Sequence, residues 1–563
     1  MRQDDLLHRP RGADCFPTAD RGFTVRLRAR RQVCRRAALI YSCNKYTWTA
    51  GRKRIQMERA FTDSEYDYYA AHIREEDTRL AYIFELEGED GVWFFSEEGV
   101  TRTYDHQLAY YSFFQYSFVH DCDVFRPVSW AGSACVYQIF PERFYNGLGE
   151  KDYVTCAWDA EPTPKSFYGG DLPGITEKLD YISGLGVNCL YLTPVFPSPS
   201  NHKYDIADYL DVDASFGGKP ALRELVQSAH ARGIRVLLDG VFNHCSSRNA
   251  LFRDAVEKGP ASEHWDWFFV HGDRVDEKAC NYDTFAAVPY MPKLNTGNPA
   301  VIRYFCDVAA YWIREFGIDG WRLDVCDELS DVFLRALRRA VKAANPDAVI
   351  IGEIWHEAGH WLRGDMLDGV MNYAFTKACL DYIVYKTIDA EGYRDRVIRG
   401  FWRYQDAASL MGLNLIGSHD TDRFLTRVHG DAELLKMGYA AAFMMPGMVS
   451  VYYGDEVGVT GGYEPGCRKG FPWEEERQDR GVYRFIRALY ALKKQPALSA
   501  GRLNVFTENG MAVLERSAPG QTVRLYMNRT PRRRKAAAGV TVAANACAVM
   551  ILDDQGTCLL PCE

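Results

Sequence analysis

The segment 320–328, "GWRLDVCDE", places charged side chains in a stretch that otherwise predicts a buried strand. The part "WRLDV" is mostly apolar without regular alternation, which is typical of a strand covered on both faces. Arg322 and Asp324 are two positions apart, so their side chains leave the strand on the same side. An arginine and an aspartate arranged in this way form either a structural ion pair or part of a site, and this segment alone favours neither.

Short apolar runs of the same kind recur along the chain from about residue 133, separated by stretches with helical periodicity. The runs are ACVYQIFP, VNCLYLTP, IRVLLDGV, GWRLDV, VIIGEI, GVMNY, LNLIGS and MVSVYYG. Eight strands alternating with helices over about 350 residues predict an α/β fold of the (β/α)8 or TIM-barrel type. A doubly wound open sheet is the alternative, but no glycine-rich phosphate fingerprint follows any run.

The 563 residues exceed one ordinary domain, and we expect three. Residues 1–125 carry alternating strand-like runs and predict an N-terminal β-sandwich. Residues 126–498 form the barrel, and residues 499–563 return to strand-like runs that predict a C-terminal β-domain. One long spacing, the 85 positions from Asp239 to Asp324, exceeds what a strand–helix unit needs. The excess predicts a small subdomain inserted after the third strand, at about 243–298.

Composition and sequence pattern argue against several classes of function. The net charge of −8 gives no reason to expect nucleic acid or an anionic membrane as a partner. The longest apolar run, 437–454, is interrupted by Pro446 and Gly447, so we interpret it as a buried helix and a strand and not as a membrane span. The sixteen cysteines show no metal-binding spacing, and the N-terminus shows no secretory signal, so we expect a cytoplasmic protein with free thiols.

Acidic side chains recur at the carboxyl ends of the predicted strands. Asp239 ends the third run, Asp324 ends the fourth, Glu353 follows the fifth, and Asp420 follows the seventh. In a barrel these ends converge on one rim, and that rim carries the chemistry. Because charged side chains are seldom buried unless they are paired, a carboxylate at each of several strand ends indicates an active site.

Carboxylates at one rim, with histidine and arginine beside them, are typical of glycoside hydrolysis. A retaining enzyme needs a proton donor and a nucleophile about 5–5.5 Å apart, and neighbouring strands lie about 4.8 Å apart, as Asp324 and Glu353 would. We expect Arg322 to keep Asp324 ionised as the nucleophile, and Glu353 to hold a proton in drier surroundings. Three further groups are expected to bind sugar hydroxyls: Asp420, His244 and His419.

Four segments in this order, DGVFNH, GWRLDVCDE, GEIW and GSHDTD, resemble the signature segments of the α-amylase family of glycoside hydrolases. MPKLN, YQIFPERF, SFYGGDL and YYGDEVGVTGGYEPGCRK resemble the subgroup of neopullulanases, cyclomaltodextrinases and maltogenic amylases. The resemblance covers nearly the whole chain and is weakest after residue 500. It implies hydrolysis of α-1,4-glucosidic bonds in cyclodextrins, malto-oligosaccharides and pullulan or starch, with some transglycosylation. It also implies a homodimer formed through the N-terminal domain.

The resemblance assigns roles to single residues. It makes Asp324 the nucleophile, Glu353 the acid/base and Asp420 the transition-state stabiliser, in agreement with the assignment from the residues. Tyr204 resembles the aromatic side chain that stacks on the sugar at the cleavage subsite. Glu328 matches an acceptor-side glutamate that favours transfer to sugars. The other implied substrate contacts are His244, Arg322, His419, Glu464 and Arg468, and Glu464 stands where the subgroup commonly has Asp, so that its contact is expected to be longer or shifted.

The subgroup often has a structural calcium site beside the barrel, whereas the chemistry itself requires no cofactor. The matching candidate ligands are Asn146, Asp152, Gly169 and Asp171. However, Leu148 and Lys151 stand where oxygen donors are expected, and calcium takes six to eight oxygens. The alternative is that the Lys151 ammonium occupies the position of the cation.

Two rival functions remain at this point. An enzyme of the same family that mainly transfers glycosyl units or acts on another α-glucoside would differ in its relative rates on β-cyclodextrin, pullulan and starch. A non-catalytic amylase-like scaffold would have lost one of the acids or carry a membrane segment, and the sequence shows neither feature.

Overall fold

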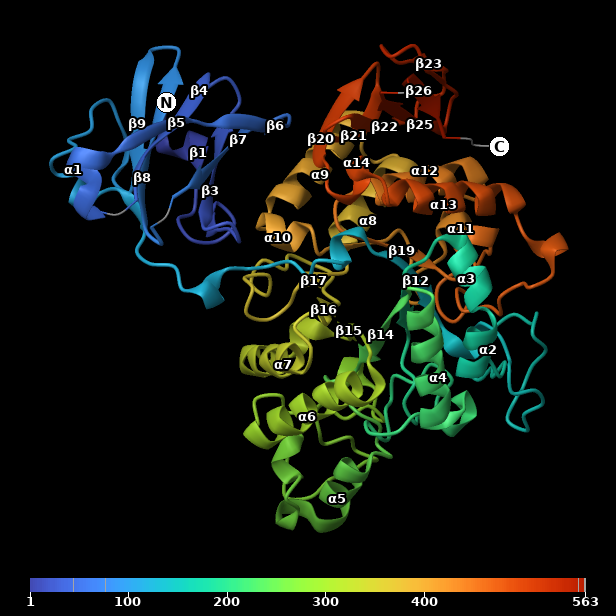
Figure 1. Ribbon diagram of the computed structural model, residues 1–563. Coiled ribbons are helices and arrows are strands. Elements are labelled where there is room, and N and C mark those ends of the chain that lie inside the picture. Colours follow the sequence, from blue (N-terminus) through green and yellow to red (C-terminus); the bar gives the residue numbers. More distant parts are fainter. Residues whose placement is uncertain (44, 76, 555, 561–563) are drawn as a thin grey trace.

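The computed structural model describes residues 1–43, 45–75, 77–554 and 556–560. It consists of an N-terminal β-sandwich, a central barrel with an insertion, and a C-terminal β-domain (Figure 1). The fold class predicted from the sequence is therefore confirmed. Within the described residues, no helix is both long enough and apolar enough to cross a membrane.

The barrel is an eight-stranded parallel sheet, and each of the eight predicted apolar runs contains one of its strands. The strand order is β17-β16-β15-β14-β13-β12-β19-β18, and a parallel bridge between Met371 and Leu413 joins the two ends. This closure excludes the open doubly wound sheet. The strands are β12 (Cys135–Ile139), β13 (Cys189–Leu192), β14 (Arg235–Gly240), β15 (Gly320–Leu323), β16 (Val349–Gly352), β17 (Gly369–Val370), β18 (Leu413–Asn414) and β19 (Met448–Tyr452).

Strand β15 is buried along its whole length, as the opening segment predicted. A side chain at Gly320 would place its Cβ atom 2.2 Å from the carbonyl oxygen of Val349, so glycine is required for the close approach of β15 and β16. Trp321 packs with its ring centroid 5.5 Å from that of Phe242, in the layer outside the barrel. The side chain of Arg322, on the opposite side of the strand, therefore enters the barrel interior.

Helices surround the barrel strands (Figure 1). Several begin at a polar residue whose side chain accepts a hydrogen bond from the first helical turn, among them Asn298 before α6 and Ser330 before α7. The helices are α2 (Leu172–Glu177), α3 (Leu179–Leu185), α4 (Gly218–Ala231), α5 (Ala250–Lys258), α6 (Pro299–Phe316), α7 (Asp331–Ala344), α8 (Tyr373–Cys379), α9 (Ala390–Trp402), α10 (Asp406–Ser409), α11 (Phe424–Arg427), α12 (Ala432–Met444), α13 (Arg480–Lys493) and α14 (Pro496–Ser499).

The insertion after β14 contains helix α5 and several short 3-10 turns. Isolated backbone bridges from His244 to Lys293 and from Phe268 to Leu294 tie the end of this insertion to its beginning. Lys293 is thereby placed beside the carboxyl end of β14, at the rim of the barrel, although it lies 50 positions after Asn243 in the sequence.

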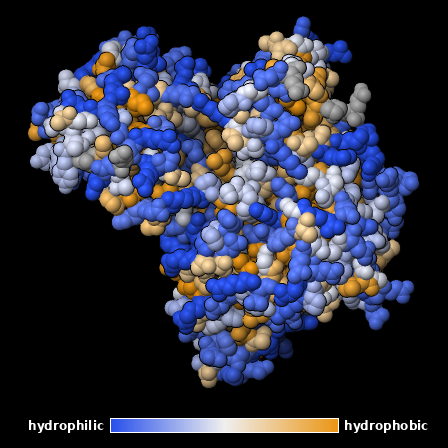
Figure 2. Space-filling model, viewed as in Figure 1, coloured by the Kyte–Doolittle hydropathy of each residue, from blue (hydrophilic) through white to orange (hydrophobic). Residues whose placement is uncertain are grey.

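The N-terminal domain packs two antiparallel sheets of five and six strands. The first contains β1 (Leu6–Leu7), β2 (Cys15–Pro17), β3 (Gly22–Arg30), β6 (Glu58–Thr62) and β7 (Tyr66–Arg74). The second contains β4 (Arg36–Ser42), β5 (Lys53–Gln56), β8 (Leu80–Gly88), β9 (Gly91–Ser96), β10 (Gly99–Thr101) and β11 (Phe114–Tyr116), and helix α1 (Trp48–Gly51) follows β4. The visible face is hollowed where this domain meets the rest of the molecule (Figure 2).

The C-terminal domain is a five-stranded antiparallel sheet with a separate two-stranded ribbon. The sheet contains β20 (Arg502–Glu508), β21 (Met511–Ala518), β22 (Gln521–Asn528), β25 (Ala546–Asp553) and β26 (Gly556–Leu559), and the ribbon contains β23 (Arg534–Lys535) and β24 (Thr541–Val542). The sheet packs against helices α9, α12 and α14 of the barrel's helical layer (Figure 1).

Candidate active site

The centre of the rim is occupied by Arg322 and the carboxylates around it. The Nη1 atom of Arg322 lies 2.8 Å from Oδ1 of Asp324 and 2.9 Å from both carboxylate oxygens of Asp239. The Nη2 atom of Arg322 lies 2.8 Å from Oε2 of Glu353. Strands β15 and β16 pair in parallel with Leu323 opposite Gly352, so Asp324 and Glu353 follow at neighbouring positions. Arg322 and Asp324 therefore form an ion pair within a cluster of buried carboxylates at the rim.

Burial dominates the electrostatics of this cluster. It raises the pKa of the Asp324 carboxyl well above its usual range, and the guanidinium of Arg322 opposes that rise. The side chains of Asp324 and Glu353 are 9% and 8% exposed, so both carboxyl groups are buried to nearly the same degree. Glu353 accepts two hydrogen bonds, from the Val325 amide at 3.1 Å and from Nε1 of Trp355 at 3.1 Å.

Asp420, on the loop after β18, lies beside a second group of polar side chains. His419 stacks parallel to Tyr204 with ring centroids 5.3 Å apart, and its Nε2 atom lies 2.5 Å from the Tyr204 hydroxyl and 3.1 Å from Asp420. The Gln138 amide nitrogen lies 2.7 Å from its Nδ1 atom. Burial lowers the pKa of His419 well below its usual value, so the ring is neutral and can bind without adding charge.

His244 is the second neutral histidine of the site. Burial lowers its pKa to about 3, and its ring lies flat against Phe285 with centroids 4.7 Å apart. Its Nε2 atom is buried and has no hydrogen-bond partner. An unpartnered buried nitrogen is costly, and a sugar hydroxyl would satisfy it.

Glu328 lies in the short turn after β15, farther out than the central acids. Its side chain is 45% exposed, and its Oε2 atom accepts from Lys293 at 2.7 Å and from Asn243 at 3.3 Å. Lys293 also contacts the Asn243 amide oxygen. The role of Lys293 was not predicted, although it lies in the quoted MPKLN segment, because the sequence does not show which strand end the insertion returns to.

Arg468 connects Asp420 to the last predicted contact, Glu464. Its Nη2 atom lies 3.0 Å from Oδ1 of Asp420 and also contacts Glu464, and its Nε atom donates to the His419 carbonyl at 2.9 Å. The longer side chain of Glu464, at a position where the subgroup commonly has Asp, thus reaches Arg468, so that these residues form one chain of contacts at the rim.

Several site residues were not predicted as such from the sequence. Gln138 and Tyr191 lie on β12 and β13, and the Tyr191 hydroxyl donates to Asp239 at 2.7 Å. Trp355 is half exposed and stacks on Tyr373 with ring centroids 3.6 Å apart. In the sequence, each of these residues is a polar or aromatic side chain inside a buried strand or directly after one. Sequence alone does not distinguish such a side chain from an ordinary core residue.

The candidate calcium ligands do not fit a bound calcium ion. The Lys151 ammonium lies 2.5 Å from the Gly169 carbonyl and 2.6 Å from Oδ2 of Asp171. The Asp171 carboxylate also accepts from the backbone amides of Gly147, Leu148 and Gly174. The Asn146 amide nitrogen is bonded to Gly149, and Asp152 is exposed. The position is therefore filled by the ammonium group of Lys151.

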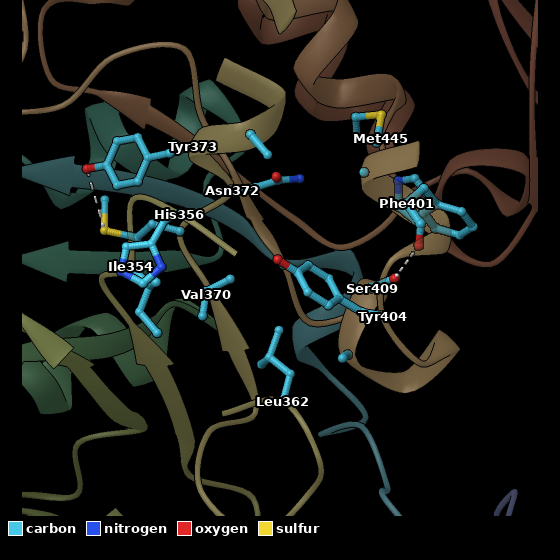
Figure 3. Close-up of a pocket in the computed structure, with 16 residues that line it drawn as sticks. Ile354, His356, Leu362, Val370, Asn372, Tyr373, Phe401, Tyr404, Ser409 and Met445 are labelled. Atoms are coloured by element: carbon cyan, nitrogen blue, oxygen red, sulfur yellow. Dashed lines mark hydrogen bonds between the residues drawn. The ribbon is translucent and has the colours of Figure 1, made fainter. Parts of the chain in front are cut away.

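A small cavity lies beside Ile354, the residue after Glu353, and none of the predicted site residues lines it (Figure 3). Its volume is about 30 Å³, enough for roughly one water molecule. Ile354, His356 and Tyr373 form the wall nearest the site, and Phe401 and Tyr404, at and just after the end of α9, form the opposite wall. The cavity is too small to admit a sugar.

Comparison with known proteins identifies the family. The family described as "Alpha amylase, catalytic domain" matches residues 138–482, and "Alpha amylase, N-terminal ig-like domain" matches residues 1–120. This chain belongs to the α-amylase family. It is therefore a glycoside hydrolase of that family, as the sequence predicted.

Relatives within the family carry the names of the predicted subgroup. The chain is 40% identical to Neopullulanase 2 of Thermoactinomyces vulgaris over 503 residues, which cover 88% of this chain and 85% of the relative. It is also 40% identical to Intracellular maltogenic amylase of Bacillus subtilis strain 168, with the same coverage. A solved structure of a cyclomaltodextrinase superposes with a TM-score of 0.90 at 38% identity and covers 95% of this chain and 92% of that structure.

Proposed function

We propose that this α-amylase family enzyme cleaves α-1,4-glucosidic bonds of cyclodextrins and malto-oligosaccharides, and also acts on pullulan and starch, with retention at the anomeric carbon. The observation that carries the proposal is the placement of Asp324 and Glu353 on neighbouring strand ends, both within 2.8 Å of one guanidinium. Two carboxyl groups on adjacent strands match the short separation of a retaining pair. The names of the relatives support the choice of substrates.

The proposed mechanism assigns one role to each acid. Asp324 attacks the anomeric carbon and forms a covalent glycosyl ester, while Glu353 donates a proton to the leaving oxygen. Glu353 then takes a proton from water, which attacks the same carbon and releases the sugar with its original configuration. Asp420, held between His419 and Arg468, binds ring hydroxyls as positive charge develops on the sugar.

The neutral polar groups complete the substrate site. Tyr204 provides the aromatic surface for the sugar at the cleavage point, and the free Nε2 atom of His244 offers a hydrogen-bonding partner for a hydroxyl. Glu328 lies on the acceptor side, where one of its oxygens is occupied by Lys293. There Glu328 binds a hydroxyl of an acceptor sugar, which then competes with water for the glycosyl group. This competition accounts for the proposed transglycosylation.

The assembly and location of the enzyme are proposals as well. We infer a homodimer formed through the N-terminal domain, and a cytoplasmic enzyme. Support for the location comes from the described cysteines, which are all free, and from the intracellular relative. The chemistry of the three acids requires no cofactor.

The test uses Asp324→Asn, which preserves the shape of the side chain and removes the nucleophile. We expect turnover of β-cyclodextrin to fall by at least about 10³-fold with an unchanged melting temperature. Retained turnover would contradict the assignment.

Two measurements on the wild-type enzyme test the choice of substrate. Panose as the product from pullulan would indicate cleavage of α-1,4 bonds, whereas maltotriose would indicate cleavage of α-1,6 bonds. The relative rates on β-cyclodextrin, pullulan and starch distinguish the proposed hydrolase from an enzyme that mainly transfers glycosyl units.

A further inference from the structure

The loop 354–362 follows the proposed acid/base and carries groups that contact the site. Trp355 donates its indole N–H to Oε1 of Glu353 at 3.1 Å, and His356 lies 2.9 Å from Asp327. The cavity of Figure 3 is lined by residues of this loop and by residues at the end of α9. Since a gap in packing removes dispersion contacts, the position of the loop depends more strongly on its individual hydrogen bonds.

One of these hydrogen bonds joins the loop to Tyr404, a residue that lines the cavity. The amide of Ala358, a fully buried residue, donates to the Tyr404 hydroxyl at 3.1 Å. Figure 3 shows Tyr404 with its hydroxyl pointing toward the side on which Ile354 and Val370 lie. Tyr404 stands two residues after the end of helix α9, so this bond joins the loop to the C-terminal end of that helix.

The N-terminal domain holds the same helix end. Arg26, on strand β3 and 2% exposed, donates to the carbonyl of Tyr404 at 2.7 Å and to that of Trp402 at 3.3 Å. Its guanidinium lies 4.5 Å from the Trp402 ring and contacts Asp406 of α10. A cation at the C-terminal end of a helix satisfies carbonyls that have no partner within the helix, so Arg26 caps α9 from another domain.

We propose that Tyr404 is a positioning residue that couples docking of the N-terminal domain to the alignment of the acid/base Glu353. Its carbonyl is held by Arg26, and its hydroxyl holds the loop whose Trp355 donates to Glu353. This inference rests on the proposed role of Glu353. It assigns to the N-terminal domain an effect on the active site of its own chain, through contacts that join residues 378 and 46 positions apart.

The first experiment compares substrates that need the acid to different degrees. In Tyr404→Phe we expect kcat on β-cyclodextrin to fall about five- to tenfold, the effect of one lost hydrogen bond. For 4-nitrophenyl α-maltoside, whose leaving group needs little protonation, we expect a change of less than about twofold. KM should stay within about twofold for both. Tyr385→Phe is the matched control, because that half-exposed hydroxyl accepts from Arg427 and does not contact the loop.

The second experiment tests the link between the two contacts. Arg26→Met removes the donors and keeps an apolar side chain over Trp402, and it should reproduce the substrate-dependent loss. The double variant Arg26→Met with Tyr404→Phe should be no slower than the slower single variant, since both changes break one connection. Additive losses, or equal losses on both substrates, would overturn the proposal.

Amide hydrogen exchange gives a readout that does not depend on activity. Protection of the Ala358 amide should fall in Tyr404→Phe and in Arg26→Met, and should stay unchanged in Tyr385→Phe. Unchanged protection in Tyr404→Phe overturns the coupling even where Arg26→Met does not fold. Glu353→Gln separates the two hypotheses: if it retains turnover of β-cyclodextrin, the proposed function fails, whatever the result at Tyr404.

Discussion

At the scale of single residues, Arg322 organises the active site because one planar guanidinium meets three carboxylates. Asp239, Asp324 and Glu353 all lie within 2.9 Å of its terminal nitrogens. Burial disfavours the charged form and raises the pKa values of Asp239 and Asp324, and the guanidinium of Arg322 opposes that rise. Arg322 therefore favours the ionised form of both aspartates.

The pH profile should report this balance. The nucleophile must be ionised, and burial raises the pKa of Asp324, so kcat/KM should fall as the pH is lowered, at a higher pH than for a free aspartate. Arg322→Gln removes the opposing cation, so the acid limb should move to higher pH. Arg322→Lys keeps the positive charge, so the acid limb of its pH profile should stay closer to that of the wild type. Both variants should lose activity, because neither retains the planar guanidinium group that contacts the carboxylates. Identical acid limbs in all three proteins would contradict this role.

Lys151 supplies a second residue-scale prediction, about stability. Its ammonium and Asp171 form a pair with side chains 8% and 0% exposed, and removing one partner leaves a buried charge. Lys151→Ala should lower the free energy of unfolding by about 3 kcal/mol. Added calcium and EGTA should leave the melting temperature of the wild type unchanged, as measured by calorimetry. A rise in melting temperature with calcium in the wild type would show that the cation displaces the lysine.

At the scale of elements, the barrel strands were predictable and the side-chain contacts at their ends were only partly so. The eight apolar runs identify β12 to β19 because a strand covered on both faces needs continuous apolar residues, whatever its partners. Asp324, Glu353 and Asp420 could be placed on one rim because strand ends converge there. The contact of Tyr404 with Ala358 could not be predicted, since it depends on how far a loop extends across a cavity.

The turn after β19 contains a titrating group whose effect on stability has a defined sign. Glu456 is fully buried, accepts from the hydroxyls of Tyr137 and Tyr181 at 2.5 Å and 2.8 Å, and has its pKa raised by burial to about 7. Between about pH 4.5 and 7 the folded state binds more protons at this site than the unfolded state. The site therefore adds stability as the pH falls through that window, and this contribution is lost as the pH rises through 7.

Glu456→Gln isolates this contribution because glutamine keeps the shape and does not titrate. We expect the difference in unfolding free energy between the wild type and Glu456→Gln to shift in favour of the wild type on going from pH 8 to pH 5, by on the order of 3 kcal/mol. Urea titrations at the two pH values measure that difference. A difference that is independent of pH, or that shifts in favour of Glu456→Gln at pH 5, would show that the carboxyl is ionised throughout.

At the scale of the whole molecule, the N-terminal domain has two faces with different contacts. One face docks on its own chain, through Arg26 at the end of α9, Asp63 to Arg399 at 2.8 Å, and Glu58 to Arg502 at 2.5 Å. These pairs join segments several hundred residues apart, so no periodicity in the sequence could predict them. They hold the domain against the barrel and against the C-terminal domain.

The other face exposes several large aromatic and aliphatic side chains. Tyr46 is 74% exposed, Leu108 is 61% exposed and Tyr111 is 81% exposed, and Lys45 lies against the rings of Tyr46 and Tyr110. Aromatic residues clustered on a surface are typical of an interface, since they bury a large area at low entropic cost. For the proposed homodimer, this patch is a suitable contact surface.

We therefore expect the proposed dimer to depend on this aromatic patch and not on the docking face. Tyr111→Glu combined with Leu108→Glu places charges where the partner would bury them, and should shift sedimentation velocity from dimer toward monomer at micromolar concentration. The melting temperature of the barrel should change little, because both side chains are exposed in the single chain. Glu89→Lys, at an exposed turn of the same domain, is the control for a change of charge alone. A dimer that persists in the double variant would place the interface on another surface, because two charges buried without partners at its centre would cost more than the remaining contacts supply.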